Sequence, residues 1–286
     1  MIIAKKIFLL IIAILLIYLL IPSQAFAGRT LIVGVNANWP PMQMKDSNGN
    51  ICGYEIDLLY AIAQDMGLEI KLVDVPRRNL FYDLSAGKYD AVMALVSIAR
   101  DTKSKFVFSD PYFFAEQVLL VPKNKPFDHL EGKVVGVFKL SKEVESIRSN
   151  LGCNIAYYTF EESEQAFKDL VKGYLDGVLC DSPLALNYLS KYPGKLTVKE
   201  YAPMLGKESA NEKYAITVNK CDRETLELFN KGLQSVKEKG IESKLREKWF
   251  KENLMNIDSK SHGFIIASEH YIEHLTSQTP KMKTNR

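Results

Sequence analysis

The chain has few of the residues that build metal sites or covalent catalytic sites. Among its 286 residues there are only four cysteines, and no two of them form a C-x-x-C pair. They are scattered along the chain as Cys52, Cys153, Cys180 and Cys221. Their even number permits disulfide bridges in an oxidising compartment, but their spacing demands none. We therefore expect no zinc site, and we treat any disulfide as an accessory to the core.

Histidine is equally scarce and lies mostly where no fold is expected. Of the four histidines only His129 precedes residue 254, and it sits in the loop F-D-H-L-E-G. His270 and His274 are one helical turn apart and could share a metal, but no third ligand is fixed near them, so we favour a solvated tail. We predict no metal, no cofactor, and no Ser-His-Asp or Cys-His nucleophile.

Neither sign of charge dominates the chain. It has 37 lysines and arginines against 34 aspartates and glutamates, a formal net charge of +3. This balance excludes a strong long-range attraction to nucleic acid or to a membrane surface. Internal repeats and low-complexity linkers are also absent, which is typical of a packed globular chain.

The one long apolar run lies at the N-terminus. Two lysines precede 15 apolar residues, Ile7 to Ile21, and the small-residue pattern A-F-A follows and ends at Ala27. The run is shorter than the ~20 residues that a membrane-spanning helix needs. We predict a signal peptide over residues 1–27 with cleavage near Ala27. Removing 27 of the 286 residues leaves 259 residues and a net charge of +1, because two lysines are lost.

After residue 30, short β-branched runs alternate with amphipathic segments, a pattern that predicts an α/β fold with mostly parallel strands. The expected strands are 31–35, 69–75, 90–97, 118–122, 132–138, 154–160, 177–181 and 214–219. The expected helices include 54–67, a short one ending at Gly87, one reaching Gly173 and a long one over 225–250.

The order of these segments predicts that the chain crosses twice between two lobes. Lobe 1 would comprise 28–120 plus 214–253, and lobe 2 would comprise 121–213. Two crossings make a hinge. Residues 254–286 form a tail to which we assign no role.

Six motifs follow one another in an order that resembles a known family. They are W-P-P-M (39–42), G-Y-E-I-D-L (53–58), A-G-K-Y-D-A (86–91), F-V-F-S-D-P-Y-F-F (106–114), D-G-V-L-C-D-S-P (176–183) and K-E-K-G-I-E-S-K-L-R-E-K-W-F (237–250). Together they resemble the family 3 periplasmic solute-binding proteins, which capture polar amino acids for import. The resemblance implies the two-lobed periplasmic binding protein fold (type II), in which each lobe is a mostly parallel sheet flanked by helices.

The resemblance also implies a function. Two lobes would close on a small polar solute, an amino acid or a related carboxylate, and deliver it to the membrane subunits of an ABC importer. Such a protein would be a periplasmic monomer that performs no covalent chemistry and has no nucleic-acid partner.

Two other functions are weighed against it. Cyclohexadienyl dehydratases are similar to this fold and carry a catalytic site, for which Glu55 and Asp181 are possible acids. Extracellular sensor domains are similar too, but a sensor would need an output domain or a separate receptor. We expect no output domain here, which leaves a soluble partner of a separate receptor as the sensor alternative.

Four candidate ligand-binding residues match the family's positions. Trp39 matches an aromatic wall, which would suit stacking on a flat or cationic group. Ser97 matches a position that hydrogen-bonds a ligand carboxylate, Ser141 matches a hydroxyl near a helix N-terminus of the family, and Asp181 matches the acid that receives an α-ammonium group. Three of the four have a local alternative: packing for Trp39, a local cap for Ser97 and helix capping for Asp181.

The sequence departs from the family where an arginine would bind the ligand's α-carboxylate. In S-I-A-R-D-T-K-S-K (97–105), Thr102 stands in register with that arginine, and Arg100 lies two positions earlier. Arg77 stands where the family often has a second aromatic wall, and related branches place an arginine at Arg78. We therefore expect an anionic group of the ligand to bind in a shifted pose near Arg77, Arg78 or Arg100; the alternative is that these are solvated surface cations.

Overall fold

The computed structural model describes residues 28–96, 105–125, 127, 129–138, 152–199 and 211–251. The predicted signal peptide and the tail lie outside these residues. Ser97, Arg100, Thr102 and Ser141 lie outside them as well. Within the described residues no helix combines the length and the apolar character needed to cross a bilayer.

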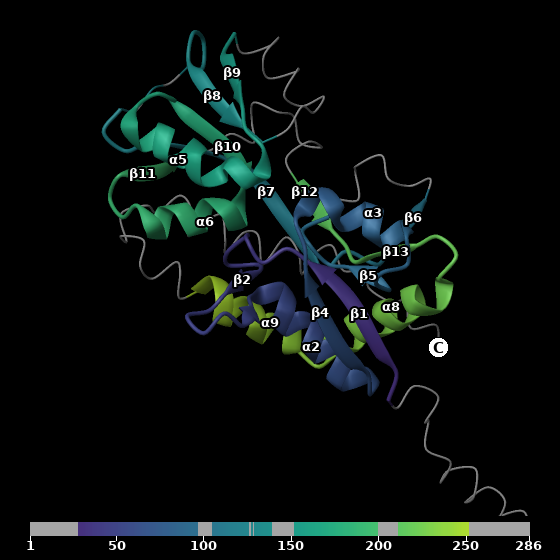
Figure 1. The fold of residues 1–286 in the computed structure, drawn as a ribbon. Helices are drawn as coiled ribbons and strands as arrows, with labels where there is room; N and C mark the ends of the chain where they lie inside the picture. The colour runs from purple at the N-terminus through teal and green to yellow at the C-terminus, as the bar shows by residue number, and fades with distance from the viewer. Residues whose placement is uncertain are drawn as a thin grey trace, which may run out of the picture.

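Two sheets form the centres of the two lobes (Figure 1). The first has the order β4-β1-β5-β13-β6, with bounds Glu69–Asp74, Thr30–Val35, Ala91–Val92, Thr217–Asn219 and Phe106–Phe108. The second has the order β11-β7-β10-β8-β9, with bounds Leu196–Lys199, Phe113–Pro122, Gly177–Asp181, Val134–Val137 and Asn154–Tyr157. A short hairpin pairs β2 (Met44–Lys45) with β3 (Ile51–Cys52).

Each sheet has a parallel part and an antiparallel part. In the first, β4, β1 and β5 run parallel, while β13 runs antiparallel to both of its neighbours. In the second, β10, β8 and β9 run parallel, while β7 is antiparallel to β10 and β11. The antiparallel strand β7 leads the chain out of the first lobe, and β13 brings it back. Because β4, β1 and β5 are parallel to one another, as are β10, β8 and β9, the carboxyl ends of each set lie on one edge of its sheet.

The two crossings between the lobes pair with each other. β12 (Asn211–Tyr214) runs antiparallel to the first half of β7, with Tyr214 opposite Phe113. The amide of Tyr112 also donates to the carbonyl oxygen of Tyr214 over 3.0 Å. Figure 1 shows β7 running from one group of elements into the other. The hinge is therefore a hydrogen-bonded two-stranded ribbon.

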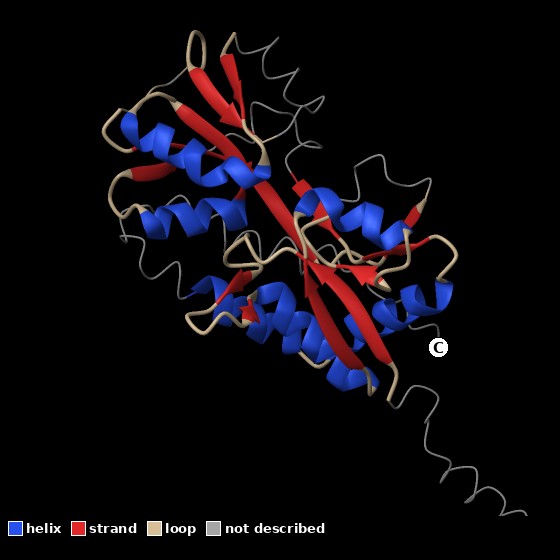
Figure 2. Cartoon of the chain, in the orientation of Figure 1, coloured by secondary structure: helices blue, strands red, loops and turns tan. Residues whose placement is uncertain are grey.

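Helices cover both faces of the first sheet (Figure 2). On one face α2 (Tyr54–Met66) packs against α8 (Arg223–Glu238) and α9 (Ile241–Arg246). Gly232 allows the close approach of α8 to α2, because a Cβ atom there would lie 2.4 Å from Ile62 Cγ2. On the other face α3 (Leu80–Ser85) follows the 3-10 turn η1 (Arg77–Asn79) and buries Leu80 and Leu84.

In the second lobe α5 (Ser163–Lys172) and α6 (Ser182–Lys191) lie on the sheet (Figure 2). Phe167 of α5 stacks on Tyr188 of α6 with ring centroids 3.6 Å apart. The 3-10 turn η2 (Phe160–Glu162) precedes α5, and Thr159 and Glu162 form a capping box around it. Gly173 ends α5 in the left-handed conformation predicted for a glycine C-cap, as Gly67 does after α2.

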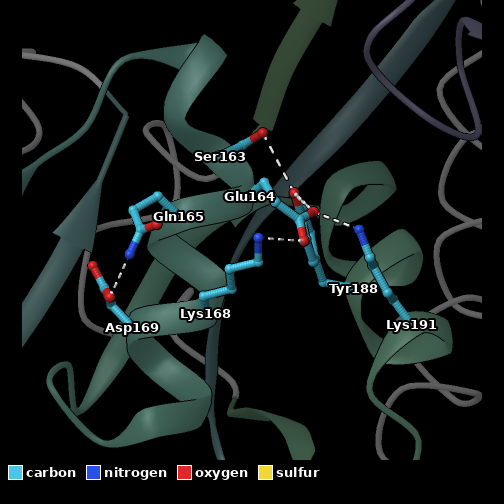
Figure 3. Close-up of polar contacts among 7 residues, drawn as sticks. All are labelled: Ser163, Glu164, Gln165, Lys168, Asp169, Tyr188 and Lys191. Atoms are coloured by element: carbon cyan, nitrogen blue, oxygen red, sulfur yellow. Dashed lines mark hydrogen bonds and ion pairs between the residues drawn. The ribbon is translucent and has the colours of Figure 1, made fainter.

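Glu164 joins α5 to α6 at the surface of the second lobe (Figure 3). Its carboxylate pairs with Lys191 and, at 3.7 Å, with Lys168, and it accepts a hydrogen bond from the Tyr188 hydroxyl at 3.4 Å. The hydrogen bond from Lys191 is the main cause that lowers the pKa of Glu164. Glu164 therefore links the two helices through interactions whose charged groups are partly exposed to solvent.

Several expected elements differ from the structure. The strand over 154–160 ends at Tyr157, and the strand over 118–122 is the second half of the longer β7. The helix over 225–250 is three pieces, α8, α9 and a π-helical turn at Glu247–Lys251, because Gly240 adopts a left-handed φ of 68° and ends the first piece. The strand over 214–219 is divided between β12 and β13, because the chain changes sheets there. Among the described residues of 90–97, the strand β5 covers Ala91–Val92.

Gly53 fixes the turn that carries Trp39. It precedes α2 with φ 132° and ψ 173°, a conformation almost restricted to glycine. A Cβ atom there would lie 2.2 Å from the carbonyl oxygen of Met42. This close approach lets the amides of Tyr54 and Glu55 donate to the carbonyl oxygens of Pro41 and Met42. The start of α2 therefore holds the W-P-P-M turn in place.

We predict that Gly53→Ala destabilises the protein by at least about 3 kcal/mol, since backbone strain of ~1–3 kcal/mol is added to a clash with backbone atoms. Urea unfolding measures the change. Gly49→Ala is the matched control, because Gly49 also has a positive φ, 83°, but nothing lies within 4 Å of a Cβ atom there. Equal losses for the two variants would contradict the close approach at Met42.

We predict that Glu164→Gln costs at most about 1 kcal/mol at pH 7, since exposed ion pairs contribute little. The folded-state pKa of Glu164 is lowered. Its contribution is therefore present above the unfolded pKa and is lost as the pH falls through the folded pKa. Wild type and variant should become equally stable in acid. A difference that persists at pH 2 would contradict the role of the Glu164 charge.

Candidate ligand site between the lobes

The carboxyl ends of the parallel strands of the two sheets meet where the lobes touch. The loops that follow β1 and β4 carry Trp39 and Arg77, and the loops that follow β8 and β9 carry Phe138 and Phe160. Ligands of open α/β sheets bind outside these strand ends. We call Trp39, Arg77, Phe138 and Phe160 the inter-lobe cluster.

Trp39 is the aromatic residue that the first lobe contributes to this cluster. It is 5% exposed, and its backbone amide and carbonyl both bond to Gln43, which closes the W-P-P-M turn. Its ring meets Phe160 edge-on with centroids 5.1 Å apart and Phe138 at 6.5 Å. Within the part of the chain that the structure describes, the buried Trp39 Nε1 atom has no hydrogen-bond acceptor.

Arg77 brings a positive charge to the same place. It opens η1 directly after β4 and is half-buried. Its guanidinium donates to the carbonyl oxygens of Ala94 at 2.7 Å and Leu95 at 3.2 Å. On the other lobe it lies over the Phe160 ring, with 4.6 Å from Cζ to the ring centroid. Arg77 therefore connects the end of β5 to the second lobe through a cation–π contact.

The second lobe supplies an aromatic row behind this contact. Phe138 and Phe160 lie nearly parallel with centroids 6.1 Å apart, and Phe138 also meets Phe167 at 6.1 Å. Phe167 in turn stacks on Tyr188, so the row runs from the cluster into the core between α5 and α6. The position of Phe160 thus depends on rings packed well away from the lobe contact.

Asp181 lies at the end of β10, on the strand next to β8. Its carboxylate caps α6 by accepting from the amide of Leu184 at 3.4 Å, and it accepts a hydrogen bond from the hydroxyl of Tyr214. Tyr214 belongs to the hinge strand β12 and is 1% exposed. Asp181 therefore does serve as a helix cap, and the same carboxylate also contacts the hinge. The ligand contact expected for it stays a prediction.

The structure thus brings together some predicted site residues and not others. Trp39 and Arg77 meet in the inter-lobe cluster, with Asp181 at a neighbouring strand end. Arg78 is exposed on η1, and no contact between it and the cluster occurs among the described residues. Phe138 and Phe160 were not predicted. The capping-box pattern T-F-E-E was a visible signal that Phe160 begins a turn after a strand, but not that its ring crosses to Trp39.

Beneath the cluster lies a buried carboxyl group, Glu55. It is fully buried in the first turn of α2, where it accepts from the amide of Leu95 at 3.1 Å and from the hydroxyl of Tyr112. The side-chain amide of Gln43 donates both to Glu55 and to the carbonyl oxygen of Met93. Three donors from three parts of the chain therefore meet on one carboxyl group.

Burial raises the pKa of Glu55 to about 7, although the hydrogen bonds from Tyr112, Leu95 and Gln43 and the charge of Arg77 all act to lower it. Burial also holds the pKa of Tyr112 well above its usual range, and the Glu55 charge adds to this. The carboxyl group of Glu55 therefore changes charge near neutral pH, whereas the hydroxyl of Tyr112 stays neutral.

The arrangement has features that suit binding of a small molecule. A cation and an acid are carried by different lobes and are accompanied by aromatic rings, which suits a small molecule with both charges. No group of three or more potential metal ligands occurs among the described residues, and the four cysteines are free thiols. Two lobes with an aromatic and charged cluster between them are typical of the two-lobed binding proteins.

The chain belongs to the bacterial extracellular solute-binding proteins, family 3, whose family model matches residues 31–252. A relative from Neisseria gonorrhoeae, named "Probable histidine-binding protein", is 34% identical over 232 residues, which cover 78% of this chain and 84% of the relative. The match confirms the family that the six motifs predicted. The family's description places its members outside the cytoplasm.

Solved structures confirm the two-lobed fold. An ancestral arginine-binding protein bound to arginine is 32% identical with a TM-score of 0.66, and the match covers 77% of this chain and 98% of that one. An ancestral amino acid-binding protein described as a precursor of cyclohexadienyl dehydratase is 30% identical with a TM-score of 0.65, covering 77% and 95%. Both are similar to this chain over nearly their whole length.

We predict that Phe160→Ala shifts the fluorescence of Trp39 to longer wavelength, because the ring that covers its edge is removed. The chain has two tryptophans, so a Trp249→Phe background isolates Trp39. The control is Tyr174→Ala, which removes an aromatic residue that is 71% exposed on the same lobe and should leave the emission unchanged. An unshifted spectrum for Phe160→Ala would show that the lobes do not meet at Trp39 in solution.

Proposed function

We propose that this protein captures an amino acid or a related carboxylate between its lobes and delivers it to an ABC importer. The observation that carries this proposal is the presence of opposite charges on the two lobes, one at the lobe contact and one at a neighbouring strand end. Arg77 of the first lobe reaches the second lobe at Phe160, and Asp181 of the second lobe lies two strands from Phe160, at the end of β10. A zwitterion could place its carboxylate at Arg77 and its ammonium at Asp181.

The side chain of the ligand would lie against the aromatic rings. Trp39 and Phe160 offer faces and edges for stacking, which contributes ~0.5–1.5 kcal/mol per pair beyond the burial of area. An acceptor on the ligand would also satisfy Trp39 Nε1, a buried donor whose isolation costs ~1–3 kcal/mol. Ser97, Arg100, Thr102, Ser141 and Arg78 stay candidates for further ligand contacts.

Capture would use the paired crossings as its hinge. We place the lobes at 28–120 plus 214–253 and at 121–213, so that β7 and β12 contain the boundaries. Export would follow cleavage near Ala27, and the protein would act as a monomer in the periplasm. The inter-lobe cluster supports this proposal because a contact made of single side chains can part without unfolding either core.

A binding function is preferred over a dehydratase on the same fold. The proposed acid Glu55 is fully buried and accepts hydrogen bonds from Tyr112, Leu95 and Gln43. Asp181, the other possible acid, caps a helix and bonds Tyr214. The similarity to an ancestral precursor of cyclohexadienyl dehydratase keeps turnover of carboxylated rings worth assaying beside binding.

The test is a thermal-shift screen of residues 28–286 against amino acids, dicarboxylates, polyamines and carboxylated rings. A ligand at a hundred times its dissociation constant adds ~2.7 kcal/mol of stability. For the best amino acid we predict that Arg77→Ala raises Kd about 10- to 100-fold, since a charge-assisted bond contributes ~1.5–3 kcal/mol. Arg223→Ala, which removes an exposed arginine of α8 in the first lobe, is the matched control and should leave Kd unchanged. Shifts only with polyamines, or equal losses for the two variants, would overturn the proposal.

A further inference from the structure

Leu95 has a backbone conformation that other groups must hold. Its φ is 49°, and it is the one non-glycine residue with a positive φ among the described residues. The left-handed conformation costs an L-residue with a branched side chain on the order of 1–2 kcal/mol. Leu95 is also 4% exposed, so the turn is built into the core beneath the lobe contact.

Three polar groups hold this turn. Glu55 accepts the amide of Leu95, Arg77 donates to the carbonyl oxygens of Ala94 and Leu95, and Gln43 donates to the carbonyl oxygen of Met93. Glu55 also bonds Gln43 directly. The carboxyl group of Glu55 and the side chain of Gln43 therefore link the turn to the end of the W-P-P-M segment that carries Trp39.

The same carboxyl group touches the hinge. Tyr112 donates its hydroxyl to Glu55, and its backbone amide donates to the carbonyl oxygen of Tyr214 on the other crossing. Val96, the residue after Leu95, accepts the amide of Ala215, which directly follows β12. The turn thus joins the hinge on one side and leads on the other into residues 97–104, which contain Ser97, Arg100 and Thr102.

We propose that Glu55 is a positioning residue for ligand capture, whose negative charge holds the Leu95 turn and thereby places Arg77 against Phe160 of the second lobe. In its ionised form the carboxylate accepts all three donors and attracts the guanidinium. A protonated carboxyl group accepts the same donors more weakly and no longer attracts Arg77. Closure of the lobes then weakens as the pH falls from 8 to 6.

No other described group near Glu55 explains a change in this pH range. The groups that face it are Tyr112 and Gln43, with Arg77 acting through its charge and Tyr54 near Tyr112. The Tyr112 hydroxyl is held neutral by burial, and a guanidinium is permanently charged. The one described histidine, His129, lies in an exposed loop of the second lobe.

The first test follows Trp39 emission of the full protein from residue 28 in the Trp249→Phe background, without ligand, between pH 5.5 and 8.5. We expect a shift to longer wavelength on acidification with a midpoint near 7. Glu55→Gln should abolish the transition. Tyr112→Phe should move its midpoint upward, because the hydrogen bond from Tyr112 lowers the pKa of Glu55.

The controls are Glu227→Gln, which removes an exposed carboxylate on α8, and His129→Gln. Both should keep the transition. A transition that survives in Glu55→Gln, or one that disappears in His129→Gln, overturns the proposal. If Glu55→Gln does not fold, Tyr112→Phe decides alone: an unmoved midpoint overturns the proposal and an upward shift supports it.

The second test rests on the proposed function and uses isothermal titration between pH 5.5 and 8.0 with L-arginine and L-glutamine, whose charges are nearly constant in this range. We expect the affinity of wild type to fall several-fold on acidification and that of Glu55→Gln to be weak at every pH. Loss of binding by both proteins to every amino acid would sink the proposed function, while the emission transition would still decide the role of Glu55. Equal pH profiles for both proteins would overturn that role.

Discussion

The buried carboxyl group of Glu55 is the interaction on which the lobe contact depends. A carboxylate removed from water is costly unless donors surround it. Here the donors are Gln43 directly after the W-P-P-M segment, Leu95 in the turn after β5 and Tyr112 at the hinge. Because each donor is a different stretch of chain, none can move alone without leaving a buried polar group unsatisfied. The first lobe therefore presents Trp39 and Arg77 to the second as one rigid unit.

The contact itself has a different character. Trp39, Arg77 and the rings of Phe138 and Phe160 meet through ring edges and a cation–π contact. Such contacts tolerate small displacements and separate at modest cost. Two rigidly packed lobes, joined at this cluster by contacts that separate at modest cost, are what a protein needs to open and close around a solute.

Much of the fold could be predicted because its signals are local. The segments that became α2 and β10 were visible from apolar spacing, and Gly67 and Gly173 marked helix ends. The break at Gly240 was missed because the residues on both sides keep a helical pattern. The early end of β5 was missed because the amide of Leu95 bonds Glu55, 40 residues earlier, rather than a neighbouring strand. Trp39 and Arg77 could be predicted from motif position, whereas Phe160 reaches the first lobe through Trp39 and Arg77, which lie more than 80 positions earlier in the chain.

The paired crossings restrict how the lobes can move. Between Asn211 and Tyr214 the two strands keep a fixed register against Glu116 to Phe113. Bending such a ribbon across its flat face preserves its backbone bonds, whereas sliding one strand along the other would break bonds of ~1 kcal/mol each together. The lobes can therefore move by bending of the β7–β12 ribbon, whereas sliding of one lobe along the other is resisted. An opened molecule would close along the same path, so Phe160 would return to the same edge of Trp39 after each cycle of capture and release.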